Sequence, residues 1–561
     1  MISRVMSPFW LVFSSFLLSF AWLLPNHSFP WLGFHGDAWA ASILAVVAAF
    51  VLWRQRCTVG WHWLTAVAAI VGLIPLLQFV VGMVPLFGVA WINAAYMLGF
   101  LVALLVGAAW EEGASRQCAD FLYLAIGIAA IVSVGLQIYQ LLDLDPVGPW
   151  TLRSSGSRHF ANMAQPNQLA SLLLLGVLAC GWGFNQRRIG PSIAIGTAGL
   201  LLVGVAFTES RTGVINVVLI SAAMAFWRRL APSKAFLWVV IALAFFYVAC
   251  LLAVPTLNQL FFPDAARADR AYLGDTRWGA WVMFLKAAAN RPWFGFGWGQ
   301  LAHAQFLMLD ERIVFGGSFL QAHNLVLDLI LWNGVPIGLA IFAFLAWWFF
   351  MVVRRMAQPQ QLYLLLFLTV LGVHAMLEYP LQYAYFLLPA GLVMGNLNVA
   401  SKFGLAFGSR RWLNAAVLLL SIAALAVTVR DYFRAETSFY GLRFELKKIP
   451  VDIPRTPPEV LVLTQWRDYV RFARIEPRSG MTAQELEWMR GVVTTAPSAF
   501  IMYRFAAVLA LNGEPVEAQK WLRRICQVSP VDQCRAIEAE WDAQSRLNKG
   551  IAAVPWPSKP N

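Results

Sequence analysis

Long apolar blocks dominate the first 430 residues of this chain. Each block is roughly 16 to 25 residues long, which is the length that an α-helix needs to cross about 30 Å of hydrocarbon. Of the 561 residues, 60% are hydrophobic and 13% are charged, whereas about a quarter of the residues in a soluble domain are charged. The chain is therefore predicted to be an all-α polytopic membrane protein.

Hydropathy predicts about thirteen membrane-spanning helices. Their ranges are 9–25, 38–53, 61–81, 89–109, 121–141, 167–184, 192–207, 213–228, 235–254, 325–352, 362–379, 383–399 and 413–430. The first range follows Arg4 and ends without an Ala-x-Ala cleavage pattern. We therefore interpret it as a retained span and not as a cleaved signal peptide.

Basic residues gather in alternate loops between these ranges. They are Arg54, Arg56, Arg116, Arg187, Arg188, Arg228, Arg229, Lys234, Arg354, Arg355, Lys402, Arg410 and Arg411. Because Lys and Arg accumulate on the cytoplasmic side of a membrane, these loops are predicted to be cytoplasmic together with the N-terminus. The net charge of +13 follows partly from this topology. Nucleic-acid binding is disfavoured, because basic pairs between apolar runs do not form a continuous basic face.

The polar segments that resemble functional sites fall on the opposite, extracytoplasmic side. The longest is the loop 255–324, and shorter ones include 142–166 and 208–212. After residue 430 the chain becomes charged, rich in proline and helical in period. We therefore predict a membrane domain over 1–430, including the large loop, and a soluble helical domain over 431–561.

The tail contains a segment typical of a helical repeat. Residues 497–530 span 34 positions and are similar to one tetratricopeptide-type hairpin, although any amphipathic helix pair gives a comparable pattern. A further helix is expected from TAQELEWMRGVV, residues 482–493. Cys526 and Cys534 lie in this tail and form either a disulfide, if the tail is exported, or two free thiols.

His323 and Asn324 stand where a long apolar run begins. An imidazole at the edge of the membrane is suited to moving protons at a lipid-borne substrate. The alternative is a purely structural histidine at a helix end, which is the commoner role of a lone histidine in such a place.

Two arginines lie near the predicted outer boundary of the membrane. Arg211 follows Glu209 at the end of one span, and Arg277 begins an amphipathic helix with Trp278 and Trp281. Each arginine either anchors its segment at the interface or binds an anion such as a diphosphate, for which guanidinium supplies multidentate donors. For Arg211, pairing with Glu209 is a third possibility.

Amides gather at the start of the span that begins near residue 167. Arg158 lies in a basic loop just before Gln165 and Gln168. The glutamine amides either point into a polar cavity or belong to a plain helix cap.

The segment HAMLEYPLQY, residues 374–383, carries three further polar groups. His374 and Glu378 are four residues apart and are expected to pair on one helix face. Metal ligation is disfavoured, since no third ligand has suitable spacing. Tyr379 would then point toward the extracytoplasmic side.

Several of these segments together resemble the bacterial O-antigen ligase and polymerase superfamily of membrane glycosyltransferases. They are SRTG (210–213), the RWxxW helix with its RPWFGFGWG turn (291–299), the HN pair (323–324) and EYP (378–380). QPNQLA (165–170) and HAMLEYPLQYAYFLLP (374–389) are more similar to the PglL-type protein oligosaccharyltransferases than to the lipopolysaccharide ligases. The resemblance extends over residues 26–398.

The resemblance implies a GT-C-like enzyme of the bacterial inner membrane that uses no metal and no cofactor, with its active site and tail in the periplasm. The donor would be a glycan on undecaprenyl diphosphate. The acceptor would be a Ser or Thr hydroxyl of an exported, pilin-like protein. Alternative activities are ligation to the lipid A core and O-antigen polymerisation. A transporter is disfavoured because the spans hold few charges.

The resemblance also assigns roles to individual residues. The catalytic residues would be His323, Tyr379 and Gln165, with Gln168 as a rival for the glutamine. The residues that bind the diphosphate or the rest of the donor would be Arg211, Arg277, Asn324, Gln168 and Arg158.

Overall fold

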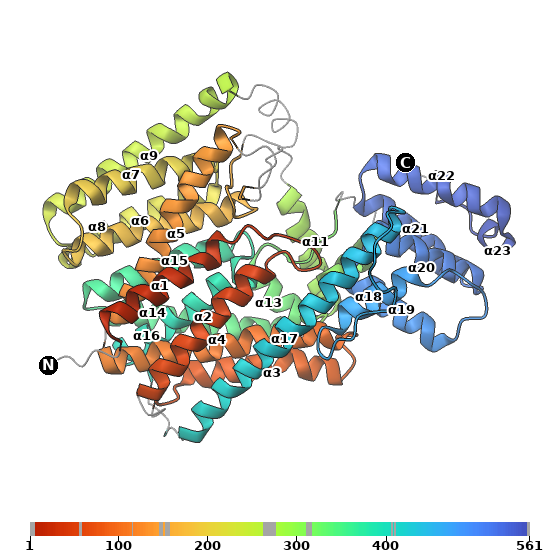
Figure 1. Cartoon of the computed structure of the whole chain (residues 1–561), viewed down its shortest axis with the longest axis horizontal. Coiled ribbons are helices and arrows are strands. Elements are labelled where there is room, and N and C mark those ends of the chain that lie inside the picture. The colour runs from red at the N-terminus through yellow and green to blue at the C-terminus, as the bar shows by residue number, and fades with distance from the viewer. Residues whose placement is uncertain are drawn as a thin grey trace. The chain divides into compact units, whose positions relative to one another are not determined.

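The computed structural model describes residues 6–54, 59–114, 116–144, 150–151, 158–261, 276–309, 317–404, 408 and 411–557. These residues form helices joined by turns and loops, and they contain no β-strand (Figure 1). Within them, eight helices are long and apolar enough to cross a membrane. The protein is therefore an all-helical, multi-pass membrane protein.

The helices lie in the order of the apolar blocks. Those before residue 262 are α1 (Pro8–Leu23), α2 (Phe34–Arg54), α3 (Trp63–Val80), α4 (Phe87–Ala114), α5 (Gln117–Leu141), α6 (Pro166–Asn185), α7 (Pro191–Phe207), α8 (Arg211–Phe226), η1 (Arg228–Leu230) and α9 (Lys234–Phe261). Those after it are α11 (Thr276–Asn290), α12 (Leu301–Met308), α13 (Leu325–Asn333), α14 (Val335–Arg355), α15 (Pro359–Ala375), η3 (Pro380–Gln382), α16 (Ala384–Ala400), α17 (Arg411–Leu446), α18 (Thr464–Arg474), α19 (Ala483–Thr495), α20 (Ala499–Leu511), α21 (Pro515–Val528), α22 (Val531–Leu547) and α23 (Lys549–Ala552).

Helices occupy all of the predicted membrane-spanning ranges, but not all of them have the length of a full span. The long ones are α2, α3, α4, α5, α6, α9, α14 and α17, whereas α1, α7, α8, α15 and α16 are shorter apolar helices. The predicted count of about thirteen spans therefore stays a prediction. Proline stands at the first helical position of several of these helices, where its missing N–H leaves no hydrogen bond unmade.

The predicted span 325–352 is wrong as a single helix. α13 ends at Asn333 and α14 begins at Val335, because Gly334 adopts a φ of 82°. A Cβ on Gly334 would lie 2.2 Å from the carbonyl oxygen of Trp293, so only glycine allows this approach. His323 therefore precedes a short helix and not a continuous membrane span.

Contacts between residues divide the chain into two compact units. Unit 1 comprises Met1–Val71, Tyr96–Gly274 and Phe344–Leu425, and unit 2 comprises Gly72–Ala95, Asp275–Ala343 and Ala426–Asn561. This division groups residues by packing, whereas the predicted domains 1–430 and 431–561 separate membrane from soluble residues. The domain assignment therefore stays a prediction.

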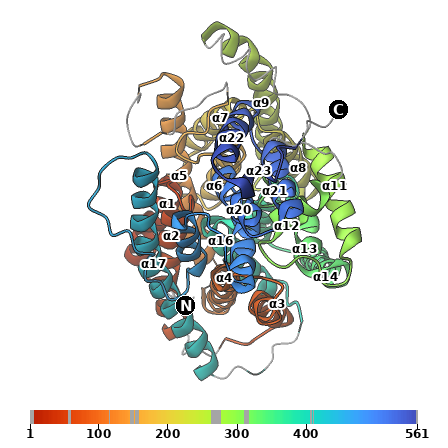
Figure 2. The same cartoon turned by 90° about the vertical axis from the view of Figure 1, so that its right-hand side faces the viewer.

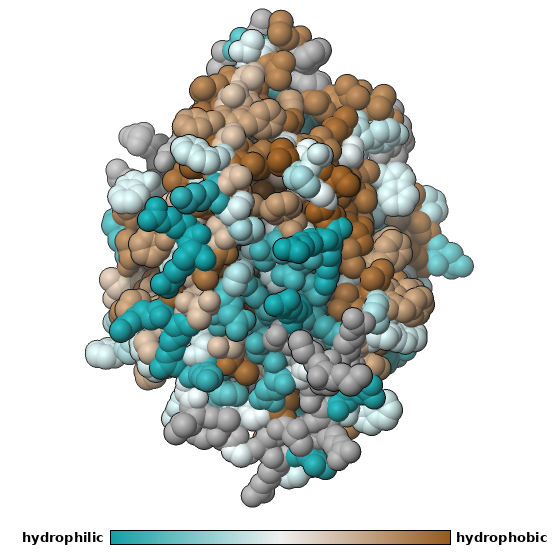
Figure 3. All heavy atoms as spheres, turned by 90° about the vertical axis from the view of Figure 1, so that its left-hand side faces the viewer, coloured by the Kyte–Doolittle hydropathy of each residue, from teal (hydrophilic) through white to brown (hydrophobic). Residues whose placement is uncertain are grey.

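Unit 1 has a continuous apolar core in which small residues let helices approach closely. A Cβ on Gly107 of α4 would lie 2.0 Å from the carbonyl oxygen of Leu392, and one on Gly395 of α16 would lie 2.0 Å from that of Leu104. Such contacts are typical of helix packing in membranes. Large apolar side chains are also exposed, and Figure 3 shows apolar groups across the upper part and toward the edges of one face, around a hydrophilic area in its middle. Exposure of this kind is expected where helices face lipid.

Unit 2 includes the helices of the tail (Figure 2). α20 and α21 form the predicted hairpin, with Gly513 between them at a φ of 82°, and α19 is the expected extra helix. Phe306 of α12 packs against Trp521 of α21 at 5.4 Å between ring centroids. A disulfide joins Cys526 to Cys534, which settles the alternative left open by the sequence. A tetratricopeptide-like character of this region stays a prediction.

Candidate functional site

His323 lies in unit 2, directly before α13, and has an unusual backbone conformation. Its φ of 54° is in the left-handed region, which residues other than glycine seldom adopt. The ring of Phe319 meets the imidazole edge-on, with 6.2 Å between ring centroids. Because a strained conformation persists only where its surroundings hold it, the neighbours of His323 are informative.

Both backbone polar groups of Ala322, the residue before His323, form hydrogen bonds. The indole Nε1 of Trp281 donates a hydrogen bond to the carbonyl oxygen of Ala322 at 2.9 Å. The Ala322 N–H donates to Oδ1 of Asp328 at 2.8 Å. Neither contact was predicted from the sequence, because a hydrogen bond to a distant backbone group leaves no sequence pattern.

Asn324 caps α13. Its side-chain oxygen accepts hydrogen bonds from the backbone N–H groups of Val326 at 3.0 Å and Leu327 at 3.2 Å. These bonds satisfy donors that the first turn of a helix cannot pair internally. The structure thus gives Asn324 a structural task, and its predicted role in donor binding stays a prediction.

Arg277 lies in the first turn of α11. Its side chain falls outside the described residues. Trp281 follows four positions later on the same helix, about one helical turn away. α11 therefore brings the backbone of Arg277 near the tryptophan that holds Ala322.

Unit 1 contains a network of polar side chains centred on Glu378. This carboxylate is 3% exposed. It accepts hydrogen bonds from the side-chain amides of Asn167 at 2.9 Å and Gln165 at 3.2 Å. Gln165 is the residue before Pro166, where α6 begins. The predicted glutamine is thus joined to the residue next to Tyr379.

Asn167 extends this network to two other segments. Its Oδ1 accepts hydrogen bonds from Ser210 Oγ at 2.7 Å and from a terminal nitrogen of Arg158 at 3.4 Å. Arg158 Nε also donates to the carbonyl oxygen of Thr208 at 3.0 Å. Ser210 caps α8, whose first residue is the exposed Arg211. Unit 1 therefore brings together the segments that carry Gln165, Arg158 and Arg211.

Gln168 lies in a different environment from Gln165. It is 2% exposed, and its Oε1 accepts a hydrogen bond from the Tyr385 hydroxyl at 2.8 Å. Tyr385 packs against Tyr383, which in turn stacks on Tyr379 with 6.2 Å between ring centroids. Gln165 is half-buried and bonds directly to Glu378, whereas Gln168 bonds to Tyr385; the choice between the two rival glutamines stays a prediction.

His374 and Glu378 do not lie on one helix as predicted, because α15 ends at Ala375, although the Glu378 N–H still donates to the His374 carbonyl oxygen at 2.8 Å. The predicted pairing of their side chains stays a prediction. The ring Nδ1 of His374 forms a hydrogen bond with Ser171 Oγ at 2.8 Å. The sequence signal that could have corrected the prediction of one helix was the proline two positions after Glu378.

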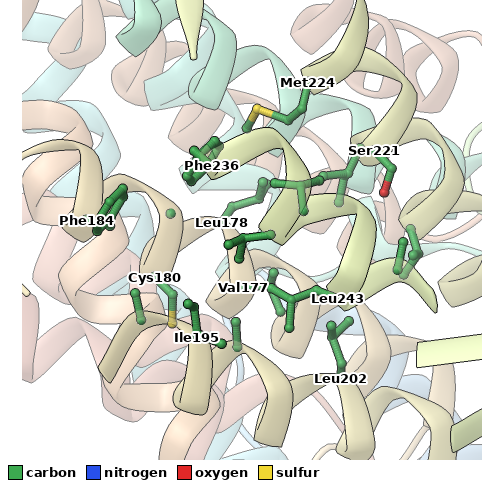
Figure 4. Close-up of a pocket in the computed structure, with 18 of the residues that line it drawn as sticks. Val177, Leu178, Cys180, Phe184, Ile195, Leu202, Ser221, Met224, Phe236 and Leu243 are labelled. Atoms are coloured by element: carbon green, nitrogen blue, oxygen red, sulfur yellow. The ribbon is translucent and has the colours of Figure 1, made fainter. Parts of the chain in front are cut away.

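An apolar cavity of about 220 Å³ lies among α6, α7, α8 and α9 (Figure 4). Side chains such as Leu178, Met224, Phe236 and Leu243 line it, and its lining includes no Asp, Glu, His, Lys or Arg. The cavity therefore offers space for hydrocarbon.

Three segments of the chain match known protein families. Residues 160–182 match the family described as Protein glycosylation ligase, residues 196–343 match O-Antigen ligase, and residues 362–544 match Virulence factor membrane-bound polymerase, C-terminal. The first segment contains Gln165, the second contains Arg211 and His323, and the third contains Tyr379. Of the candidate residues, only Arg158 lies outside these segments.

Two relatives from Acinetobacter baylyi are similar over much of their length. The General O-oligosaccharyltransferase is 28% identical over 529 residues, which cover 91% of this chain and 90% of the relative. The ComP-specific O-oligosaccharyltransferase is 26% identical over 392 residues, or 68% of this chain and 70% of the relative.

The all-helical membrane fold and the matched segments make the chain similar to the O-antigen ligase superfamily of membrane glycosyltransferases. Within it, the similarity is to the PglL-type O-oligosaccharyltransferases. The resemblance predicted from the sequence motifs is therefore confirmed.

Proposed function

We propose that the protein transfers a glycan en bloc from undecaprenyl diphosphate to Ser or Thr hydroxyls of exported proteins, such as a pilin, at the periplasmic face of the inner membrane. The observation that carries this proposal is the similarity of the chain to the General O-oligosaccharyltransferase over 91% of its length, and within it His323 adopts a left-handed φ of 54°. Strain of this kind gathers at functional sites.

In the proposed reaction, His323 acts as a general base. It takes the proton of the acceptor hydroxyl, whose oxygen bonds to the anomeric carbon as the bond from that carbon to the phosphate oxygen breaks. The lipid diphosphate leaves with the bonding electrons. General-base catalysis typically contributes about 10²- to 10⁴-fold. The alternative role for His323 is to orient the donor without moving a proton.

Negative charge develops on the leaving diphosphate, so fixed guanidinium groups stabilise the transition state more than the ground state. We assign this role to Arg211 in unit 1 and to Arg277 in unit 2. Further donor-binding roles are proposed for Arg158, Gln168 and Asn324.

Tyr379 and Gln165 complete the proposed catalytic set, and Gln165 donates a hydrogen bond to Glu378, the residue next to Tyr379. The proposed reaction needs no metal and no cofactor. Chelation of divalent cations is accordingly expected to leave the rate unchanged.

The apolar cavity supports a lipid-linked donor. Leu174 of α6 and Val217 of α8 line the cavity, and each is seven residues along its helix from a member of the polar network, Asn167 or Ser210. Seven residues of helix span about 10 Å. The same two helices therefore offer polar groups at one end and room for hydrocarbon further along.

The periplasmic orientation is supported by two features. Basic residues predominate in the loops on one side of the predicted topology. The disulfide between Cys526 and Cys534 lies in the tail on the other side, and disulfides persist in the periplasm and not in the cytosol.

The second candidate function is O-antigen ligation, in which the acceptor hydroxyl belongs to a sugar of the lipid A core. The match of residues 196–343 to the O-Antigen ligase family favours it. O-antigen polymerisation would use a sugar hydroxyl of a second lipid-linked glycan.

One experiment distinguishes these functions. The purified protein is reconstituted in proteoliposomes with undecaprenyl-diphosphate-linked glycan and, in separate reactions, a pilin-like protein, lipid A core or no acceptor. Mass spectrometry then measures glycan on each acceptor. We expect glycan on Ser or Thr of the protein; glycan only on lipid A core, or elongation without an acceptor, would overturn the proposal.

A further inference from the structure

The segment that carries His323 is fixed by contacts from three helices of unit 2. Trp281 of α11 holds the Ala322 carbonyl, and Asp328 of α13 holds the Ala322 N–H. From α12, the side chain of Gln305 accepts a hydrogen bond from Phe319 N at 2.8 Å and donates one to Gly317 O at 2.9 Å. The backbone is therefore anchored both before and immediately next to His323.

Phe319, whose backbone N–H is hydrogen-bonded to Gln305, also packs against the imidazole of His323. Its ring meets Phe284 of α11 edge-on at 5.8 Å and meets His323 edge-on at 6.2 Å, centroid to centroid. Gln305, which fixes the backbone of Phe319, is fully buried. The ring that touches His323 is thus itself held from two sides.

Asp328 is an unusual residue for the place that it occupies. It is 3% exposed, and a buried carboxylate is costly unless it is hydrogen-bonded. Its position in the first turn of α13 lowers this cost, because the helix dipole favours negative charge there. A leucine would fit an apolar helix of this kind more simply, whereas Asp328 supplies a side-chain oxygen that accepts a hydrogen bond from the Ala322 N–H.

We propose that Asp328 and Trp281 are positioning residues, which hold the Ala322 peptide so that His323 keeps its left-handed conformation and its imidazole stays directed at the reacting hydroxyl. This inference rests on the proposed function of His323. Without the two hydrogen bonds, the chain can relax to the negative φ values that non-glycine residues prefer, and the imidazole then moves away.

The consequence is a specific kinetic signature. A displacement of about 1 Å in a catalytic group can lower a rate by about 10²-fold, whereas donor binding does not depend on it. We therefore expect loss of a positioning contact to lower kcat by roughly 10- to 100-fold with a nearly unchanged KM for the lipid-linked glycan.

The test compares two matched tryptophan substitutions in proteoliposomes. Trp281→Phe removes the N–H that bonds to Ala322 and keeps an aromatic ring. Trp298→Phe removes an N–H that bonds to Asn333 Oδ1 at 2.8 Å in the same unit and does not contact Ala322. Both variants lose one indole hydrogen bond, and the melting temperature in detergent is measured for each.

Asp328 supplies a second, independent pair. Asp328→Asn keeps an oxygen that can accept from the Ala322 N–H, whereas Asp328→Leu does not. We expect kcat close to wild type for Asp328→Asn, and a fall in kcat for Asp328→Leu and Trp281→Phe that Trp298→Phe does not show. Equal kcat in the two tryptophan variants, together with equal kcat in the two Asp328 variants, would overturn the inference.

His323→Ala, measured alongside, separates this inference from the proposed function. If that variant is inactive and the Trp281 and Asp328 variants are fully active, positioning fails while the catalytic histidine stands. If His323→Ala retains normal turnover, the catalytic role itself fails, and positioning fails with it.

Discussion

The polar network of Glu378 in unit 1 and the framework of His323 in unit 2 are built in different ways. In unit 1, side chains bond to side chains: Glu378 accepts from Gln165 and Asn167, and Asn167 accepts from Ser210. In unit 2, side chains bond to backbone: Trp281 and Asp328 hold the Ala322 peptide.

This difference indicates different tasks. A network of amides, a carboxylate and a guanidinium can rearrange around a polar ligand, because each member has several possible partners. A peptide held from both sides keeps one conformation. We therefore associate the first region with contacts to the donor, including those of the proposed catalytic residue Gln165, and the second with the orientation of one catalytic group.

The largest expected effect comes from removing the imidazole of His323, the group that the framework of unit 2 is proposed to orient. His323→Ala should lower turnover by about 10²- to 10⁴-fold, the usual contribution of a general base, with donor affinity largely intact. Single-turnover transfer and direct binding of the lipid-linked glycan are the measurements. Turnover near the wild-type value would remove His323 from catalysis, and a parallel loss of affinity would favour donor orientation instead.

The second prediction tests the network of unit 1. Glu378→Ala leaves the amides of Gln165 and Asn167 without their acceptor, and each unsatisfied buried group costs about 1–3 kcal/mol. We expect a raised KM for the donor, a lower melting temperature, and a lower kcat because the proposed catalytic residue Gln165 loses its hydrogen-bond partner. Glu378→Gln, which retains an acceptor oxygen, is the matched control. A fall in kcat alone would contradict the assignment of this region to donor binding.

The third prediction examines the tail, which lies outside both regions. Cys526→Ser with Cys534→Ser removes a disulfide between residues separated by eight positions. By loop-closure entropy the bond stabilises the fold by about 2–3 kcal/mol. Limited proteolysis should cut the tail faster, while transfer to a short Ser-containing peptide stays unchanged. Loss of peptide transfer would show that catalysis depends on an intact tail.

The fourth prediction concerns how the stability of unit 2 depends on pH. Burial, with the nearby Arg291 and Arg524, lowers the pKa of His303 to about 4. The unfolded chain, in which the histidine pKa is about 6.5, then binds more protons, so stability falls as the pH drops from 6.5 toward 4. His303→Gln should flatten this dependence, measured by unfolding at pH 7 and 5. An unchanged slope would exclude His303 as its cause.

The smallest expected effect concerns a helix cap in the tail. Thr482 and Glu485 form a capping box at the start of α19. Thr482→Ala should cost about 1 kcal/mol of stability with no change in kcat or in the KM for the donor. This variant sets the baseline for stability loss without a functional effect, and a change in either kinetic constant would show that α19 contributes to transfer.

The helices were largely predictable, because apolar blocks of the right length have few alternatives in a membrane. The break at Gly334 was not, since that glycine is required only by the close approach of Trp293 from another segment. The candidate residues were found through their motifs, yet the partners of Glu378 lie more than 200 positions away in the sequence. Asp328 was missed because its hydrogen bond goes to a backbone N–H, which every residue except proline can offer.

The sequence by itself determined that this chain is a multi-pass helical protein, because lipid offers no hydrogen-bond partner to the backbone and an apolar segment must satisfy its own peptide groups as a helix. It also determined which residue types are available for chemistry. Only the tertiary structure decided which of these residues meet. The Glu378 network and the hydrogen bonds to Ala322 both depend on how separate helices pack, which local sequence does not specify.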